Sequence, residues 1–96
     1  MENEKNADSK LEIKYLCRIC GYKHDSPPWG EDGNLASFEI CFCCGIEFGY
    51  EDSTLKGIRR YRASWLESGA PWFQPSDQPE GWDLQKQLAQ IPKEFL

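Results

Sequence analysis

The sequence predicts a small α+β domain: an antiparallel β-sheet that carries two cysteine knuckles, one main helix packed on it, and a second, short C-terminal helix. Three observations predict this class. Two Cys-x-x-Cys-Gly motifs lie at 17–21 (the first knuckle) and 41–45 (the second knuckle), and their cysteine pairs are separated by the twenty residues 21–40. Short apolar alternations flank both motifs, and one helical period follows them. With 96 residues, 40% of them hydrophobic, the chain forms one domain whose core is too small to be stable without a staple.

The expected staple is a metal ion on four cysteines. Cys17 with Cys20, and Cys41 with Cys44, each enclose two residues and precede a glycine, so a tight turn can aim both sulfurs at one point. The separation of the pairs is close to that of four-thiolate zinc sites. Two disulfides are the alternative, disfavoured because nothing in the sequence suggests secretion. We expect Zn²⁺ on these four thiolates, worth about 10–16 kcal/mol in isolated zinc modules, and no folded ribbon without it.

Three further residues near the motifs have more than one interpretation. His24 can in principle replace a thiolate, but we expect an ordinary loop histidine. Cys43 is spare, either a buried small residue or a thiolate activated by the nearby metal, and we prefer burial. Arg62 falls inside the apolar arc of the main helix. We expect its aliphatic stem to be buried, or a pair with a sheet carboxylate such as Glu47, rather than a ligand-binding role.

The elements are predicted in the following order. Residues 1–10 lack an apolar period and form a disordered lead-in. Alternating apolar residues predict strands over 11–15, 36–40 and 46–50, the first two leading into the knuckles and the third leaving the second one. The turn-rich stretch 25–35 is a loop.

A capped helical period predicts the main helix over 54–68, which completes a zinc-binding core over 11–69. Gly57 weakens this helix by about 1 kcal/mol relative to alanine, so packing must hold it. Residues 70–96 form an aromatic segment that wraps the domain and end in a short helix over 83–91. This segment contains aromatic side chains that are either partner-binding anchors or compensation for a small core: Trp72, Phe73 and Trp82.

The charge is negative and uneven. The formal net charge is −5, and the stretch 25–55 holds seven carboxylates and no Lys or Arg. Such a field favours a basic protein partner, for which Glu31 and Asp32 are candidate contacts. It opposes nucleic-acid binding, although four basic residues follow within 56–62.

The sequence contains neither a signal peptide nor a membrane-spanning run, because the first ten residues are polar and no apolar stretch approaches membrane length. We therefore expect no membrane contact and a cytoplasmic location. Reducing conditions there keep thiols free for metal.

The knuckles and their flanks resemble the bacterial cysteine-rich CPCC domain. The resemblance covers roughly residues 15–67 and is carried by the runs 15–22, YLCRICGY, and 38–45, FEICFCCG. That family typically has proline after the first cysteine of a pair, where this chain has Arg18 and Phe42. The resemblance implies a zinc-ribbon-like metal-binding fold without enzymatic activity, and members occur among candidate immunity proteins of bacterial toxin systems.

The first knuckle is also similar to that of rubredoxins, which bind one iron on four thiolates and transfer an electron. The rubredoxin knuckles are further apart, and the segment that shields their iron has no counterpart in this chain. Thiolate sites accept zinc or iron, so zinc is the expected ion and iron the alternative.

Four cysteines complete a tetrahedron and leave no position for water or substrate, so catalysis is not expected. The leading hypothesis is a non-catalytic, zinc-stapled protein-binding module that neutralises a basic toxin. Rubredoxin-like electron transfer is the first alternative. A nucleic-acid-binding zinc ribbon is the second.

Overall fold

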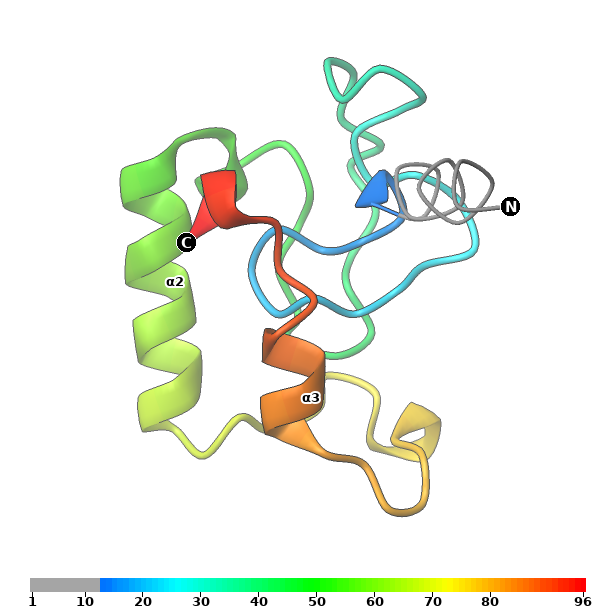
Figure 1. Cartoon of the computed structure of the whole chain (residues 1–96), viewed down its shortest axis with the longest axis vertical. Coiled ribbons are helices and arrows are strands. Elements are labelled where there is room, and N and C mark those ends of the chain that lie inside the picture. Colours follow the sequence, from blue (N-terminus) through cyan, green and yellow to red (C-terminus); the bar gives the residue numbers. More distant parts are fainter. Residues whose placement is uncertain (1–12) are drawn as a thin grey trace, which may run out of the picture.

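A computed structural model describes residues 13–96, so the lead-in predicted over 1–10 and the start of the strand predicted over 11–15 lie outside the described residues. Within these residues the elements are two α-helices and three short 3₁₀ helices (Figure 1): η1 (Glu51–Ser53), α2 (Leu55–Glu67), η2 (Pro75–Asp77), α3 (Leu84–Leu88) and η3 (Lys93–Phe95). The helix predicted over 54–68 corresponds to α2, and the one predicted over 83–91 to the shorter α3. None of these helices combines the length and apolar character that crossing a bilayer requires.

The predicted α+β class is wrong, because the described part of the chain contains no β-strand and no sheet. Each knuckle instead belongs to a hairpin with a single antiparallel bridge. This bridge joins Leu16 to Lys23 in the first hairpin and Ile40 to Glu47 in the second. The alternating residues flank the knuckles as predicted, but they do not pair beyond these bridges.

Local backbone geometry explains why the pairing stops. Within the strand predicted over 36–40, Phe38 has a φ of 62°, a left-handed conformation that interrupts an extended run. On the other side of the hairpin, Gly49 has a φ of 108°, and the Tyr50 N–H donates to the Glu47 carbonyl at 3.3 Å to form a turn. Alternation of apolar residues therefore does not by itself establish a strand: Ile46 and Phe48 are buried, whereas Phe38, Ile40 and Tyr50 remain exposed.

Helix α2 begins where its cap residue predicts. The Thr54 hydroxyl accepts the Gly57 N–H at 3.0 Å, and Ile58 and Trp65 lie on the buried face. Helix propensity does not explain why a glycine stands at position 57, but packing does. A Cβ at this position would lie 2.1 Å from the Glu51 carbonyl oxygen, so η1 packs directly against the helix backbone.

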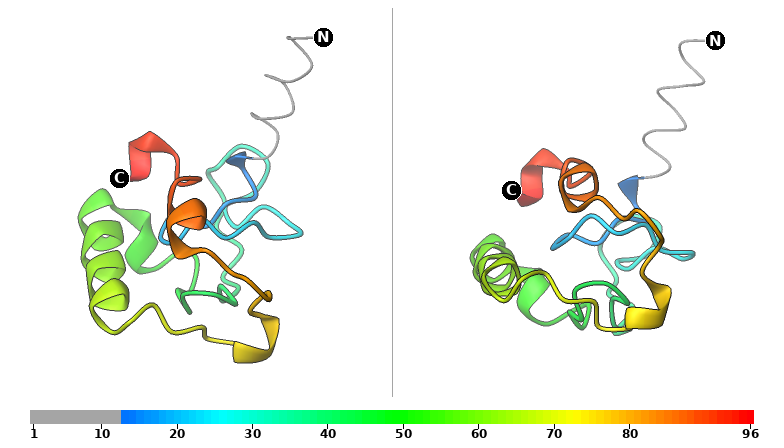
Figure 2. Two further views of the ribbon diagram at one scale, coloured as in Figure 1. Left: turned by 60° about the horizontal axis from the view of Figure 1, so that its bottom comes forward. Right: turned by 90° about the horizontal axis from the view of Figure 1, so that it is seen from below.

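The C-terminal third of the chain encloses the knuckles. From α2, residues 70–77 run past the knuckles on the side away from the helix, and α3 and η3 return toward α2 (Figure 2). The return is fixed by the Nε of Arg59, which donates to the Leu96 carbonyl at 2.9 Å. Residues 70–96 thus form a strap that closes around both hairpins.

The core is centred on the sulfur atoms. Among residues 13–96 the buried hydrophobic residues number thirteen, of which five are cysteines: Cys17, Ile19, Cys20, Cys41, Cys43, Cys44, Ile46, Phe48, Ile58, Trp65, Ala70, Trp72 and Ile91. A core with so large a cysteine share and no sheet has little apolar packing with which to hold the hairpins together.

Candidate metal centre

The two knuckles have the same backbone geometry. The Gly21 N–H donates to the Cys17 carbonyl at 3.0 Å, and the Gly45 N–H donates to the Cys41 carbonyl at 2.9 Å. Both glycines have a positive φ, 82° and 81°, which an L-residue rarely adopts. The motif residues are therefore what the turn itself requires.

The turns bring four sulfur atoms together. The Sγ atoms of Cys17 and Cys44 are 3.7 Å apart, as are those of Cys20 and Cys41, and all four lie within 4.8 Å of one another. Zn–S bonds of about 2.3 Å in a tetrahedron place sulfurs about 3.8 Å apart, whereas a disulfide requires about 2.05 Å. All five cysteines are free thiols, so this spacing fits four ligands around a metal ion and not two disulfides.

Burial shapes the charge of the cluster. It raises the pKa of the Cys20 and Cys44 thiols well above the ordinary value, since a buried thiolate is poorly solvated. Burial acts in the same direction on Cys41, but hydrogen bonds from the thiols of Cys17 and Cys20 outweigh it and lower the pKa of Cys41. A cation at the centre is the natural counter-charge for four such sulfurs, because a coordinated thiol is deprotonated.

Helix α2 holds the backbone of both knuckles from one side. The Tyr61 hydroxyl donates to the Cys44 carbonyl at 2.9 Å. Burial raises the pKa of Tyr61 to about 12, so this hydroxyl keeps its proton at neutral pH. Arg62 donates from Nε to the Ile19 carbonyl at 2.6 Å and from a terminal nitrogen to the Arg18 carbonyl at 2.8 Å.

These contacts answer the question that the sequence left open about Arg62. The same guanidinium also donates to the Phe95 carbonyl at 2.6 Å. Its partners are backbone carbonyls, so the expected pair with Glu47 is not the one observed. An arginine suits this place because its fork of donors can reach several acceptors at once.

The strap holds the knuckles from the other side. The N–H groups of Phe73 and Gln74 donate at 2.9 Å to the carbonyls of the second knuckle, at Cys43 and Phe42. In α3 and just beyond it, glutamine side chains donate to the first knuckle: Gln87 to the Cys20 carbonyl at 3.1 Å and Gln90 to the Gly21 carbonyl at 3.0 Å. The helix and the strap thus satisfy knuckle carbonyls that no sheet covers.

Cys43 is completely buried and is not one of the four clustered sulfurs. Its Sγ accepts a hydrogen bond from Gln87 Nε2 at 3.3 Å, and Trp82 Nε1 holds the other end of this amide through Gln87 Oε1 at 2.8 Å. The corresponding position of the first knuckle is Ile19, which is also completely buried. Burial, the preferred interpretation of Cys43, agrees with this environment.

His24 lies in an aromatic cluster. Its ring meets Tyr22 edge-on at a centroid distance of 4.8 Å and Phe48 at 5.2 Å. No histidine belongs to the sulfur cluster among residues 13–96. His24 is therefore not one of the four clustered ligands, although its side chain hydrogen-bonds the Cys41 thiol and helps to lower the pKa of Cys41.

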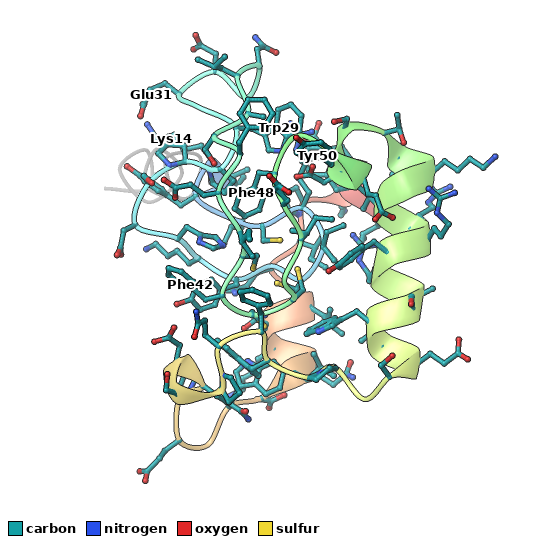
Figure 3. All side chains as sticks on the ribbon, turned by 180° about the vertical axis from the view of Figure 1, so that it is seen from behind. Lys14, Trp29, Glu31, Phe42, Phe48 and Tyr50 are labelled. Carbon is teal, nitrogen blue, oxygen red and sulfur yellow. The ribbon has the colours of Figure 1, made fainter. Side chains whose placement is uncertain are left out.

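The candidate partner residues fall into different environments. Glu31 and Asp32 are exposed in the loop, where Glu31 forms an ion pair with Lys14 (Figure 3). Trp72 is only 7% exposed and packs edge-on against Trp82 at 5.3 Å, so these two rings belong to the packing of the strap rather than to a free surface. Phe73 is 51% exposed and remains available as an anchor.

One network was not anticipated from the sequence. The Arg18 guanidinium is stacked on the Trp29 ring at 3.9 Å and donates to the backbone carbonyl of Asp52 at 3.2 Å. The carboxylate of Asp52 is completely buried and accepts from Trp29 Nε1 at 2.7 Å and from the Gly49 N–H at 2.8 Å. The sequence feature that could have indicated this network is Arg18, a charged residue in the middle of a knuckle.

Two proteins of Bacillus subtilis (strain 168) are similar to the chain. "Uncharacterized protein YoaQ" is 38% identical over 85 residues, covering 73% of this chain and 72% of that protein. "Uncharacterized protein YozI" is 37% identical over 82 residues, covering 69% and 68%. No family model and no solved structure matches the chain.

Proposed function

The chain belongs to the family of YoaQ and YozI, and we propose that it is a non-catalytic protein-binding module whose fold is stapled by one zinc ion. The observation that carries the proposal is the buried group of four sulfurs at tetrahedral spacing, on Cys17, Cys20, Cys41 and Cys44. Thiolates favour zinc among the common divalent ions that prefer a tetrahedron. Four protein ligands leave no open position, which supports a structural rather than an enzymatic role.

The proposed partner is a basic protein. Of the seven carboxylates between 25 and 55, all except the buried Asp52 are exposed, and this stretch contains no Lys or Arg. Such a surface speeds encounter with a positively charged protein and repels nucleic acid. Together with the likeness to CPCC domains, this supports toxin neutralisation as the specific role, since a nuclease toxin is basic where it holds phosphate.

Electron transfer on iron is the competing function, favoured by the matching geometry of the two Cys-x-x-Cys-Gly turns. Affinity capture from the native cell, with metal analysis of the purified protein, separates the two. The proposal expects a colourless protein with one zinc and a basic protein partner that the Cys41→Ser variant does not retain. A red protein with one iron and reversible one-electron chemistry would replace it with the electron-transfer function.

A further inference from the structure

A groove lies on the outer side of the second knuckle. Its volume is about 430 Å³, and its lining comes from two segments far apart in the chain: Phe38, Glu39, Ile40, Phe42, Phe73 and Gln74. The backbone bond from the Gln74 N–H to the Phe42 carbonyl, at 2.9 Å, holds the two segments side by side. Figure 3 shows Phe42 next to the yellow part of the strap, which carries the other wall.

The apolar side chains of the groove are exposed to an unusual degree. Phe38 is 58% exposed, Phe73 51%, Phe42 43% and Ile40 40%. Single exposed apolar residues are common on protein surfaces, but four large ones lining one hollow are typical of a binding site. The volume also falls within the range of about 300–1,000 Å³ that ligand-binding clefts occupy.

The backbone around Phe38 is arranged to present its ring. A φ of 62° is a costly conformation for a bulky residue. The ring crosses Gly49 so closely that a Cβ there would lie 2.7 Å from it, and it meets the exposed Tyr50 edge-on at 6.0 Å. Burial does not offset the cost of this conformation, because Phe38 remains 58% exposed. Strain that folding does not explain points to binding.

Charge indicates what the groove holds. The only charged residue in its lining is Glu39, and the surrounding stretch 25–55 carries exposed carboxylates without a single Lys or Arg. A second copy of this chain would bring the same negative surface and be repelled. A segment that combines large apolar side chains with Lys or Arg matches both the apolar lining of the groove and the negative charge around it.

We propose that this groove is the docking site for a basic segment of a partner protein, anchored by large apolar side chains. The inference rests on the proposed role as a protein-binding module and names the surface that performs it. In this assignment the second knuckle serves the fold on its inner side and recognition on its outer side.

The test uses the zinc-loaded full chain and random twelve-residue peptides displayed on phage. We expect the selected peptides to be enriched in Lys and Arg next to large apolar residues. Synthetic copies should bind at least tenfold more weakly to the Phe42→Ala and Glu39→Lys variants. The matched controls Leu66→Ala and Glu67→Lys, on the exposed side of α2, should bind as the parent does.

A further variant separates binding from folding. Phe38→Gly removes the ring and relieves the left-handed strain, so the peptides should bind more weakly while the thermal unfolding midpoint stays the same or rises. Zinc content is measured for each variant, so that a lost fold is not mistaken for a lost contact.

Several results would overturn the assignment of the groove: no selected peptide, a selection of acidic peptides, affinities indifferent to Phe42→Ala and Glu39→Lys, or self-association abolished by Ile40→Ser. If a partner protein is still captured from the native cell in such a case, the groove assignment fails and the proposed function stands. If neither the selection nor the capture yields a ligand, both fail.

Discussion

Replacing Cys41 with serine is the most direct test of how this fold is held together. The change removes one of four sulfurs from a cluster in which each lies within 4.8 Å of the others. A serine hydroxyl is a poor zinc ligand, because the metal takes thiolates that are soft and readily deprotonated. The expected result is loss of the metal and, with it, loss of the fold.

The magnitude follows from comparing two free energies. Structural zinc contributes about 10–16 kcal/mol, while a whole domain is stable by about 5–15 kcal/mol. In the described part of this chain each hairpin contains a single isolated bridge, and five of the thirteen buried hydrophobic residues are cysteines. The remaining contacts cannot compensate for the missing ion, so the variant should be unfolded at room temperature.

Cys43→Ser is the matched control, with the same chemical change two residues away. Cys43 lies outside the cluster, and Gln87 can donate to a serine oxygen as it does to the sulfur. The cost should be about 1–2 kcal/mol, which corresponds to a fall of roughly 5–15 °C in the unfolding midpoint of a domain this size. Zinc release to a chromogenic chelator and thermal unfolding by circular dichroism measure both quantities. Equal zinc loss from the two variants would refute the assignment of ligands.

Three further predictions concern the supports and the staple. Arg62→Ala leaves three backbone carbonyls without their donor and should lower the free energy of unfolding in urea by about 3 kcal/mol. Tyr61→Phe removes one such bond and should lower it by about 1 kcal/mol. Equal losses would contradict the role assigned to Arg62 as the main support of the knuckles. Gly57→Ala should destabilise the protein by about 1–3 kcal/mol, although alanine has the better helix propensity, because the new methyl group meets the Glu51 carbonyl. The control Ser64→Ala, at an exposed position of the same helix, should leave stability unchanged. A more stable Gly57→Ala protein would show that η1 can move aside. Removing the metal with a chelator, or lowering the pH so that protons compete for the sulfurs, should abolish the near-ultraviolet circular dichroism of the tryptophans. An unchanged spectrum would mean that the core folds without metal.

The grouping of the four cysteines could be predicted from the sequence because its determinants are local. Two residues between cysteines and a glycine after them fix the turn, and the Gly21 and Gly45 backbones adopt the positive φ that such turns need. Helix α2 could equally be predicted from the sequence, since Thr54 caps it and its apolar period is regular. These signals act within a few residues and need no knowledge of the rest of the fold.

The sheet was predicted wrongly because alternation of apolar residues does not by itself establish that two segments pair. Ile46 and Phe48 are buried as a strand would bury them, yet Gly49 turns the chain directly afterwards. The partners that replace a sheet are long-range: Arg62 reaches the first knuckle from 43 residues away, and Gln87 reaches Cys20 from 67 residues away. No local sequence pattern predicts that a side chain will donate a hydrogen bond to a carbonyl far away in the chain.

The two knuckles share a backbone but differ at two equivalent positions, and one of these differences, Arg18 against Phe42, divides their roles. Arg18 in the first knuckle is stacked on Trp29 and donates to the Asp52 carbonyl, so that it fastens the loop over 25–35 to the fold. Phe42, at the corresponding place in the second knuckle, is 43% exposed and lines the groove next to Phe73. A purely structural repeat would have little reason to leave an aromatic ring in solvent at this point. Exchanging the two residues tests the division, since Arg18→Phe should lower stability and spare peptide binding, whereas Phe42→Arg should spare stability and abolish binding of basic peptides.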